Sequence, residues 1–359
     1  MEKEVRLLKG NEALALAAIR AGADGYFGYP ITPQSEVLEC LTEEAPWETT
    51  GMVVLQAESE VSSINMVYGG AACGKRVMTT TSSPGFSLMM EGVSYIAGAE
   101  LPCVLANVMR GGPGLGTIQP SQADYFQAVK GGGHGDYRMI TLAPSSVQEM
   151  ADFVGKGFEL AFKYRNPVLI LSDGVIGQMM EKVQLPEQKP RMTDEEIRAK
   201  YPWATIGHKA SERSIITSLE LSSPVMEQNN LRFQEKYKKM EENEVLFEET
   251  QTEDAEYIIV AFGSSSRICQ KVVELCREDG IKVGMIRPIT LWPFPTKRIA
   301  ELADQAKGFI SVELNAGQMV EDVKLAVNGK APVYHYGRMG GMLFAPDEVK
   351  NAMKEYFKF

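Results

Sequence analysis

An alternation along the first half of the chain most constrains the fold. Short runs of Val, Ile and Leu end in loops rich in Gly, Pro, Ser and Thr, and each loop leads into a segment of helical periodicity. The expected strands are 25–28, 52–55, 76–79, 103–108, 138–142 and 168–171. Apolar strands that alternate with helices indicate βαβ units on a parallel sheet covered on both faces. We therefore expect an α/β fold.

The pattern stops near residue 180 and resumes near residue 257. Between them prolines recur and charge is dense, and the segment 231–249 has too few apolar residues for a core helix. Its mixed charges suit a helix that is solvated or that faces a partner. We predict a first domain over 1–180, a connector with a charged helix over 181–254, and a smaller second domain over 255–359. Both domains are expected to be open parallel-sheet units.

Composition excludes several classes of function. Lys and Arg number 37 against 47 acidic residues, a net charge of -10 that repels a polyphosphate backbone, so we expect no nucleic acid partner. The five cysteines form no CxxC pair and the three histidines no HxxH pair, so no metal or cluster site is expected. There is no secretion signal and no apolar run of about 18 residues, so we expect a cytoplasmic chain without a membrane span.

The loops that follow successive strands gather at the carboxyl edge of such a sheet, where open α/β folds bind ligands. Arg110, in the Gly-rich loop 109–117, could clamp a carboxylate or phosphate, or could be a solvated side chain of a surface loop. GSSSR at 263–267 could hold an anion at a helix N-terminus, but a simple helix cap is favoured. It lacks the further glycines of a dinucleotide fingerprint, so NAD is not expected.

Two carboxylates open the expected helix 59–73. Glu58 and Glu60 could simply stabilise the helix N-terminus, or one of them could be a buried acid that hydrogen-bonds a ligand nitrogen. Spacing alone does not choose between these. Nearer the N-terminus, Asn11 is the expected cap of the first helix, and Pro33 is expected in the first turn of the next one.

The ordered set of motifs resembles a known family. YPITP (29–33), QAESEVSSI (56–64), TTTSSPGFSLMMEG (79–92), MRGGPGLGT (109–117), and GSSSR followed by RPITLWPFP (287–295) are similar to the alpha subunit of 2-oxoacid:ferredoxin oxidoreductases. These are thiamine diphosphate enzymes with pyruvate, 2-oxoglutarate and branched-chain members. The resemblance covers residues 8–171 and 257–359. It implies a pyrimidine-binding domain followed by a transketolase C-terminal-like domain.

The resemblance also implies roles for individual residues. Glu60 would face the aminopyrimidine ring of the cofactor, with Glu58 as its rival, and would favour the ring tautomer that can take a proton. Thr32 would contact substrate, and Arg110 would lie near the substrate carboxylate. Besides Glu60, the residues implied to line the cofactor are Tyr29, Pro30, Ile31, Thr32, Ser83, Pro84 and Gly85.

The family's diphosphate and magnesium motif is missing. Ser172-Asp173-Gly174 lacks the first glycine of a GDG, and the Asn pair at 229–230 lies in the connector. By the resemblance, a beta subunit supplies the diphosphate site, Mg²⁺ and a [4Fe-4S] cluster. A gamma subunit would assist the use of coenzyme A, a substrate, and ferredoxin or a ferredoxin-like delta subunit would accept electrons. The chain alone would be inactive.

The implied reaction is oxidative decarboxylation of a 2-oxoacid to acyl-CoA and CO2, with electrons passed to ferredoxin. The GGPGLGT loop with TIQPSQADYFQA resembles the branched-chain and 2-oxoglutarate members, and no additional basic residue is evident for a distal carboxylate. This favours 2-oxoisovalerate over 2-oxoglutarate. The alternatives are the beta chain of an NAD-linked 2-oxoacid dehydrogenase and a non-catalytic α/β binding protein.

Overall fold

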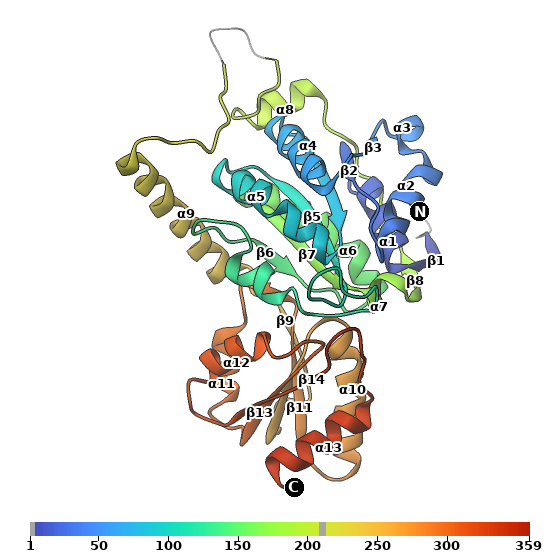
Figure 1. Cartoon of the computed structure of the whole chain (residues 1–359), viewed down its shortest axis with the longest axis vertical. Coiled ribbons are helices and arrows are strands. Elements are labelled where there is room, and N and C mark those ends of the chain that lie inside the picture. The colour runs from blue at the N-terminus through green and yellow to red at the C-terminus, as the bar shows by residue number, and fades with distance from the viewer. Residues whose placement is uncertain (1–3, 208–212) are drawn as a thin grey trace.

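The computed structural model describes residues 4–207 and 213–359, which form two stacked lobes, each built on a sheet (Figure 1). The first sheet has seven strands, and all run parallel except the edge strand β12. In spatial order they are β12 (Thr290–Trp292), β6 (Ile140–Leu142), β7 (Pro167–Asp173), β5 (Cys103–Met109), β4 (Val77–Thr81), β2 (Gly25–Gly28) and β3 (Val53–Gln56). The predicted α/β fold with a parallel sheet is confirmed.

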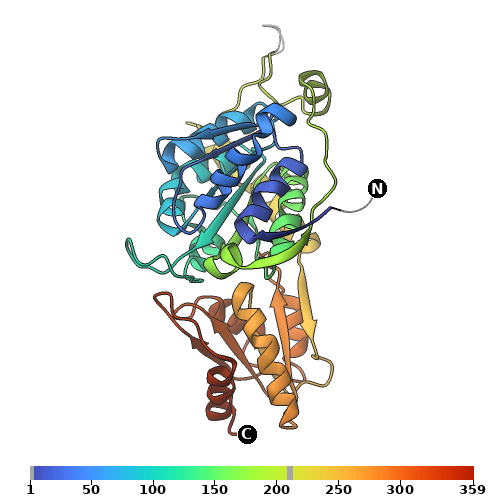
Figure 2. The same ribbon diagram turned by 90° about the vertical axis from the view of Figure 1, so that its right-hand side faces the viewer.

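Helices cover both faces of this sheet (Figures 1 and 2). One face carries α1 and α6 and the other carries α4 and α5, and each pair packs side by side. The central strands β4, β5 and β7 are buried along their whole length, and accordingly β5 and β7 are mainly apolar rather than alternating, whereas β4 follows Val77 and Met78 with three buried threonines. The helices of this lobe are α1 (Gly10–Arg20), α2 (Ser35–Glu44), α3 (Pro46–Thr49), α4 (Glu60–Ala72), α5 (Ser83–Gly98), the π-helix η1 (Gln127–Gly131), α6 (Val147–Tyr164) and α7 (Gly174–Gln178).

The second sheet has five strands, of which only the edge strand β9 is antiparallel to its neighbour. In spatial order these are β14 (Val333–Gly337), β13 (Gly308–Glu313), β10 (Tyr257–Val260), β11 (Val283–Pro288) and β9 (Phe247–Thr250). Its helices are α10 (Gly263–Glu278), α11 (Thr296–Leu302), α12 (Met319–Val327) and α13 (Pro346–Phe357).

Strand pairing crosses the expected domain boundaries. Strand β9 comes from the expected connector but lies in the second sheet, and β12 comes from the second domain but pairs with β6 of the first sheet. At the other end of the connector, β8 (Met180–Gln184) pairs with the N-terminal strand β1 (Val5–Lys9). The two lobes and the connector are therefore joined by hydrogen-bonded strands as well as by the chain.

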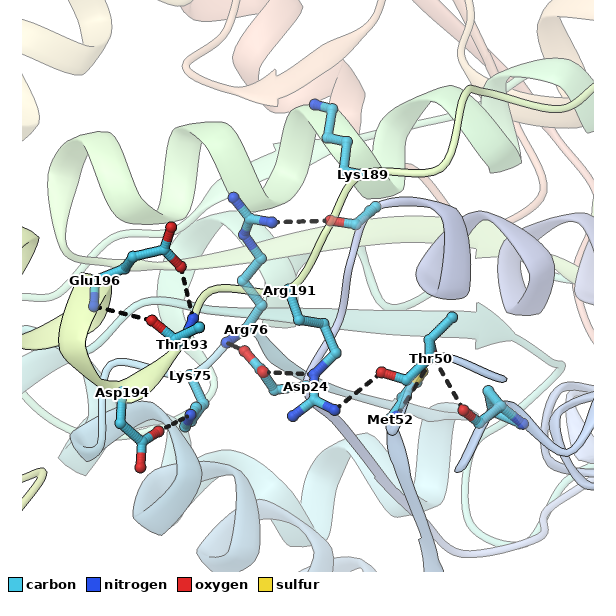
Figure 3. Close-up of polar contacts among 12 residues, drawn as sticks. Asp24, Thr50, Met52, Lys75, Arg76, Lys189, Arg191, Thr193, Asp194 and Glu196 are labelled. Carbon is cyan, nitrogen blue, oxygen red and sulfur yellow. Dashed lines mark hydrogen bonds and ion pairs between the residues drawn. The ribbon is translucent and has the colours of Figure 1, made fainter. Parts of the chain in front are cut away.

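After β8 the connector crosses the first lobe, where ionic contacts hold it (Figure 3). The Arg191 guanidinium donates to the buried carboxylate of Asp24 (2.8 Å) and to the Thr50 carbonyl (3.1 Å). The other oxygen of Asp24 accepts the backbone N–H of Arg76 (2.8 Å). The short helix α8 (Asp194–Lys200) follows, capped by Thr193. This part of the connector is thus a strap fixed to the first lobe.

The charged helix of the connector is α9 (Ser223–Asn243), and it is only partly solvated. Its C-terminal half buries Phe233, Tyr237 and Met240, and the Tyr237 ring meets Trp292 of β12 edge-on with centroids 6.0 Å apart. Its N-terminal half is exposed apart from two half-buried residues. Half of the helix is therefore a core element of this chain.

Two local predictions were wrong. Helix α1 begins at Gly10 with Lys9 as its cap, so Asn11 lies inside the first turn, where its side-chain amide donates to the Pro33 carbonyl (2.7 Å). Helix α2 begins at Ser35, so Pro33 precedes it. The Asn11 side chain thus joins two segments distant in sequence instead of capping its own helix. Among the described residues, no helix is both long and apolar enough to cross a bilayer.

Candidate functional site

Glu60 is an ionisable side chain buried at the carboxyl edge of the first sheet. It is the first residue of α4, just after β3, and is 5% exposed. Within the described part of the chain, no group donates a hydrogen bond to its carboxylate. The N-terminal end of the helix dipole stabilises a negative charge there. The carboxylate is therefore held in place with its hydrogen-bonding capacity unused.

The wall opposite Glu60 is the first turn of α5. A Cβ atom at Gly85 would overlap both the Glu60 carboxylate and the Thr81 hydroxyl, so only glycine permits this close approach. The hydroxyls of Thr81 and Ser82 are buried and have no hydrogen-bond partner among the described residues. An unpaired buried polar group costs about 1–3 kcal/mol, and a ligand with matching groups would remove that cost.

Glu58 has a different environment from Glu60. It is exposed, and one of its carboxylate oxygens accepts a hydrogen bond from Ser62 Oγ (3.2 Å) on the surface of α4. The two carboxylates flank the helix cap Ser59, and Glu58 stays on the surface whereas Glu60 is buried. The geometry places Glu60, and not Glu58, against α5.

Arg110 is buried, so the alternative of a solvated surface arginine is wrong. It is 7% exposed, and its guanidinium donates to the carbonyls of Thr32 (2.9 Å) and Leu115 (3.0 Å). Its Nε has no acceptor among the described residues. Its backbone N–H donates to Ser83 Oγ (3.0 Å). Arg110 thus ties together the YPITP loop, the Gly-rich loop and the start of α5.

The other residues expected at the site lie on the same loops. Tyr29, Ile31, Ser83 and Pro84 are half-buried, and Pro30 and Thr32 are exposed. The structure joins Glu60 to Gly85, and Arg110 to Thr32 and Ser83. No contact links the Glu60 carboxylate to Arg110.

Sequence reasoning missed two residues behind this edge. Asp124 accepts hydrogen bonds from Ser83 Oγ (2.6 Å) and from the side-chain amide of Asn107 (2.9 Å), and burial raises the pKa of its carboxyl group. A polar residue inside the apolar strand CVLANVM is a signal that could have drawn attention to Asn107. Asp124 lies in an irregular segment and offers no comparable signal.

Asp173, the acid of the incomplete GDG motif, is used by the chain itself. One carboxylate oxygen accepts the backbone N–H groups of Val175 and Ile176, and the other accepts both the N–H and the hydroxyl of Ser264 at the start of α10. The anion at the N-terminus of GSSSR is therefore this side chain. Among the described residues, no three His, Cys, Asp or Glu side chains lie close enough to hold a metal ion.

Comparison with known families agrees with this architecture. Residues 16–257 match the thiamine diphosphate-binding domain of pyruvate flavodoxin/ferredoxin oxidoreductase, and residues 255–349 match core domain II of pyruvate:ferredoxin oxidoreductase. The chain belongs to this oxidoreductase family. The resemblance inferred from the sequence motifs is thereby confirmed.

Several relatives of this family align over nearly the whole chain. The ketoisovalerate oxidoreductase subunit VorB of Methanothermobacter marburgensis is 51% identical over 98% of this chain and 97% of its own length. The 2-oxoglutarate synthase subunit KorA of the same organism is 36% identical over 97% of this chain and 98% of its own. Both are named as subunits, so a member of this oxidoreductase family works with partner subunits.

Solved structures support the same assignment. A 2-oxoglutarate:ferredoxin oxidoreductase from Magnetococcus marinus, with 2-oxoglutarate, coenzyme A and succinyl-CoA bound, superposes with a TM-score of 0.85 at 28% identity. The match covers 98% of this chain but 65% of that longer chain. An inactive tetramer of a split-gene transketolase shares the fold with a TM-score of 0.60 at 11% identity.

Proposed function

We propose that this chain is the alpha subunit of a 2-oxoacid:ferredoxin oxidoreductase and that it holds the aminopyrimidine half of thiamine diphosphate. The complex would convert a 2-oxoacid and coenzyme A into acyl-CoA and CO2 and pass the electrons to ferredoxin. The bound cofactor supplies a carbon nucleophile for the 2-oxo group and a sink for the electrons left by CO2.

The observation that carries this proposal is the buried, unpaired carboxylate of Glu60 facing Gly85. An aminopyrimidine presents a ring nitrogen and an exocyclic amine, groups that a carboxylate and the free hydroxyls of Thr81 and Ser82 can satisfy. The residues present therefore fit this half of the cofactor. Glu60 would hold a proton shared with the ring nitrogen and so control its protonation state.

Arg110 is suited to orient the substrate. Its guanidinium is fixed by two carbonyls, and its Nε retains an unused donor. A charge-assisted hydrogen bond from Arg110 would hold the carboxylate of the 2-oxoacid, and the exposed Thr32 beside it could donate its hydroxyl. The lining of the cofactor site would be completed by Tyr29, Pro30, Ile31, Ser83 and Pro84.

The rest of the active site is proposed to come from partners. The Asp173 carboxylate already accepts four hydrogen bonds, so it is not free for Mg²⁺. We assign the diphosphate site, Mg²⁺ and a [4Fe-4S] cluster to a beta subunit, with a gamma subunit and ferredoxin or a delta subunit completing a cytoplasmic complex.

For the substrate we favour 2-oxoisovalerate. The relative named a ketoisovalerate oxidoreductase subunit is 51% identical, whereas the relative named a 2-oxoglutarate synthase subunit is 36% identical. The 2-oxoglutarate alternative is supported by the structural match to an enzyme with that substrate bound.

The test is to coexpress the chain with its genomic neighbours and to measure viologen reduction with each 2-oxoacid and coenzyme A. Glu60→Gln should lower the rate about a hundredfold or more, the usual range for loss of a general acid–base group. Glu58→Gln, two residues away but exposed, is the matched control and should retain the rate. Normal activity in Glu60→Gln would refute the assignment of Glu60, and an inactive wild-type complex would refute the function.

A further inference from the structure

The segment 121–126, here called the junction segment, lies between the two sheets and is held mainly by the second one. Gln122 makes the central contacts. Its side-chain amide donates to the Phe262 carbonyl (2.8 Å), and its side-chain oxygen accepts from Ser265 Oγ (2.6 Å) and from the Leu314 N–H (3.1 Å). Its backbone carbonyl accepts from the Asn315 side chain (2.8 Å). Gln122 is fully buried.

The residues beside Gln122 are anchored to the same lobe. Ser121 Oγ donates to the Leu314 carbonyl (3.1 Å), and Tyr125 OH donates to the Asp322 carboxylate (2.6 Å). The Gln318 amide donates to the Ala123 carbonyl (2.7 Å) and accepts from the Phe126 N–H (2.8 Å). The loops after β10 and β13 thus fix the junction segment on both sides of Asp124.

Asp124 turns the opposite way, toward the candidate site. Its carboxylate accepts from Ser83 Oγ (2.6 Å) and from Asn107 (2.9 Å). Ser83 in turn accepts the backbone N–H of Arg110 (3.0 Å). Hydrogen bonds therefore tie the second lobe to Gln122, the backbone carries on from Gln122 to Asp124, and hydrogen bonds through Ser83 lead to Arg110, the residue that holds the Thr32 loop.

The Ser83 hydroxyl has one proton and two competing acceptors. They are the Asp124 carboxylate at 2.6 Å and the Arg110 carbonyl at 3.2 Å. The carboxylate is the stronger acceptor, because hydrogen bonds to an ionised group are shorter and stronger than neutral ones. While the Ser83 hydroxyl donates its hydrogen bond to Asp124, the lone pairs of Ser83 Oγ remain available to accept from the Arg110 N–H. Without the carboxylate, the hydroxyl can rotate toward the Arg110 carbonyl.

We propose that Asp124 is a positioning residue for Arg110, and that the second lobe acts on the reaction by holding Asp124 in place. This inference rests on the proposed function for its effect on catalysis. The set of hydrogen bonds itself stands on the geometry alone. On this proposal, the TIQPSQADYFQA motif and the second lobe share one role, which is to fix the part of the site that orients the substrate.

The kinetic test uses the assembled complex with Asp124→Asn, Gln122→Ala and the double variant. A misplacement of about 1 Å at an orienting group can lower the reaction rate by up to roughly a hundredfold. The kcat/KM for 2-oxoisovalerate should therefore fall about ten- to a hundredfold in each single variant. The KM for coenzyme A should not change. The double variant should be no slower than Asp124→Asn, because both changes break the same connection.

The matched control is Asp152→Asn on α6. Asp152 is likewise a carboxylate that accepts from a side-chain amide, that of Gln148, but it is exposed on α6 and makes no hydrogen bond to Ser83, Asn107 or Arg110. It should retain the wild-type rate. Equal rates in Asp124→Asn and Asp152→Asn would overturn the proposal. So would a loss in Asp124→Asn that affects coenzyme A and the 2-oxoacid alike and follows a lower melting temperature.

A second measurement does not depend on turnover. Hydrogen exchange of the full chain, followed by mass spectrometry, should show about tenfold faster exchange in peptides covering 109–117 for Asp124→Asn and Gln122→Ala, but not for Asp152→Asn. Unchanged exchange would overturn the positioning role. If exchange responds as expected while the wild-type complex turns over no 2-oxoacid, the proposed function fails and the positioning role stands.

Discussion

The ion pair between Arg287 of β11 and Glu149 of α6 crosses from one lobe to the other, and its removal should be costly. Arg287 is 2% exposed and donates to both oxygens of the Glu149 carboxylate (2.9 and 2.7 Å). It also donates to Glu248 of β9 (3.0 Å). The hydrogen bonds to these two acids and their negative charges raise the pKa of Arg287 despite the opposing effect of burial.

The loss of unfolding free energy in Arg287→Ala depends on how the remaining Glu149 carboxylate is compensated. Removing one partner of a buried ion pair typically costs about 3–5 kcal/mol, because the remaining charge is uncompensated. Glu149 keeps two donors, the backbone N–H (2.7 Å) and the hydroxyl (3.2 Å) of Ser145, so we expect the lower end of that range, about 3 kcal/mol. Adding Glu149→Gln removes the stranded charge and should restore about 1–2 kcal/mol.

The assay is urea unfolding of the full chain, followed by tryptophan fluorescence, because Trp292 lies where β12 joins the first sheet. In Arg287→Ala, the unfolding transition seen in the fluorescence of Trp292 should have its midpoint at a lower urea concentration. Arg287→Lys should show an intermediate shift, because lysine cannot reproduce the two parallel hydrogen bonds. A loss below about 1 kcal/mol in Arg287→Ala, or a double variant whose loss equals the sum of the singles, would refute this reasoning.

Two further predictions address the site and the response to acid. Gly85→Ala should weaken thiamine diphosphate binding by the assembled complex at least tenfold, because the added methyl group overlaps Glu60 and Thr81, and unchanged affinity in a cofactor titration would contradict that contact. Hydrogen bonds from Arg298 lower the pKa of Glu249 below its ordinary value of 4.5 in the folded chain. The pair therefore stabilises the fold above pH 4.5, and this stabilisation is lost as the pH falls through the lowered pKa. Glu249→Gln should therefore be less stable than wild type at pH 7 in urea unfolding, and the difference should disappear in acid; a difference that persists in strong acid would show that the pair is not responsible.

The central strands could be predicted from the sequence because they are buried on both faces. Strands β5 and β7 are mainly apolar runs between helices, and β4 adds β-branched threonines after Val77 and Met78, a pattern with few alternatives. The edge strands β9 and β12 could not be predicted in this way. β12 has only three residues and sits among prolines, and its partner β6 is distant in the sequence. Pairing of that kind depends on the assembled fold and leaves no local signal.

The site was predictable to the extent that loops after parallel strands must meet at one edge. That rule brought Arg110, Ser83 and Thr32 together, and their hydrogen bonds bear it out. The choice between Glu58 and Glu60 was not predictable, because it depends on which side chain turns inward at the helix start. Asp124 was also beyond sequence reasoning, since its carboxylate meets Ser83 and Asn107 only after its neighbours have been anchored to the second lobe.

The exchange of edge strands limits how this gene could be divided. Fission within the connector would separate β12 from β6, and the first fragment would then expose a bare edge of its sheet, a template for aggregation. A cut before α9 would leave the Tyr237–Trp292 contact on the second fragment without the first sheet, and a cut after α9 would separate the two rings. Two fragments cut within the connector would therefore have to pair β12 with β6 again before the first sheet is complete.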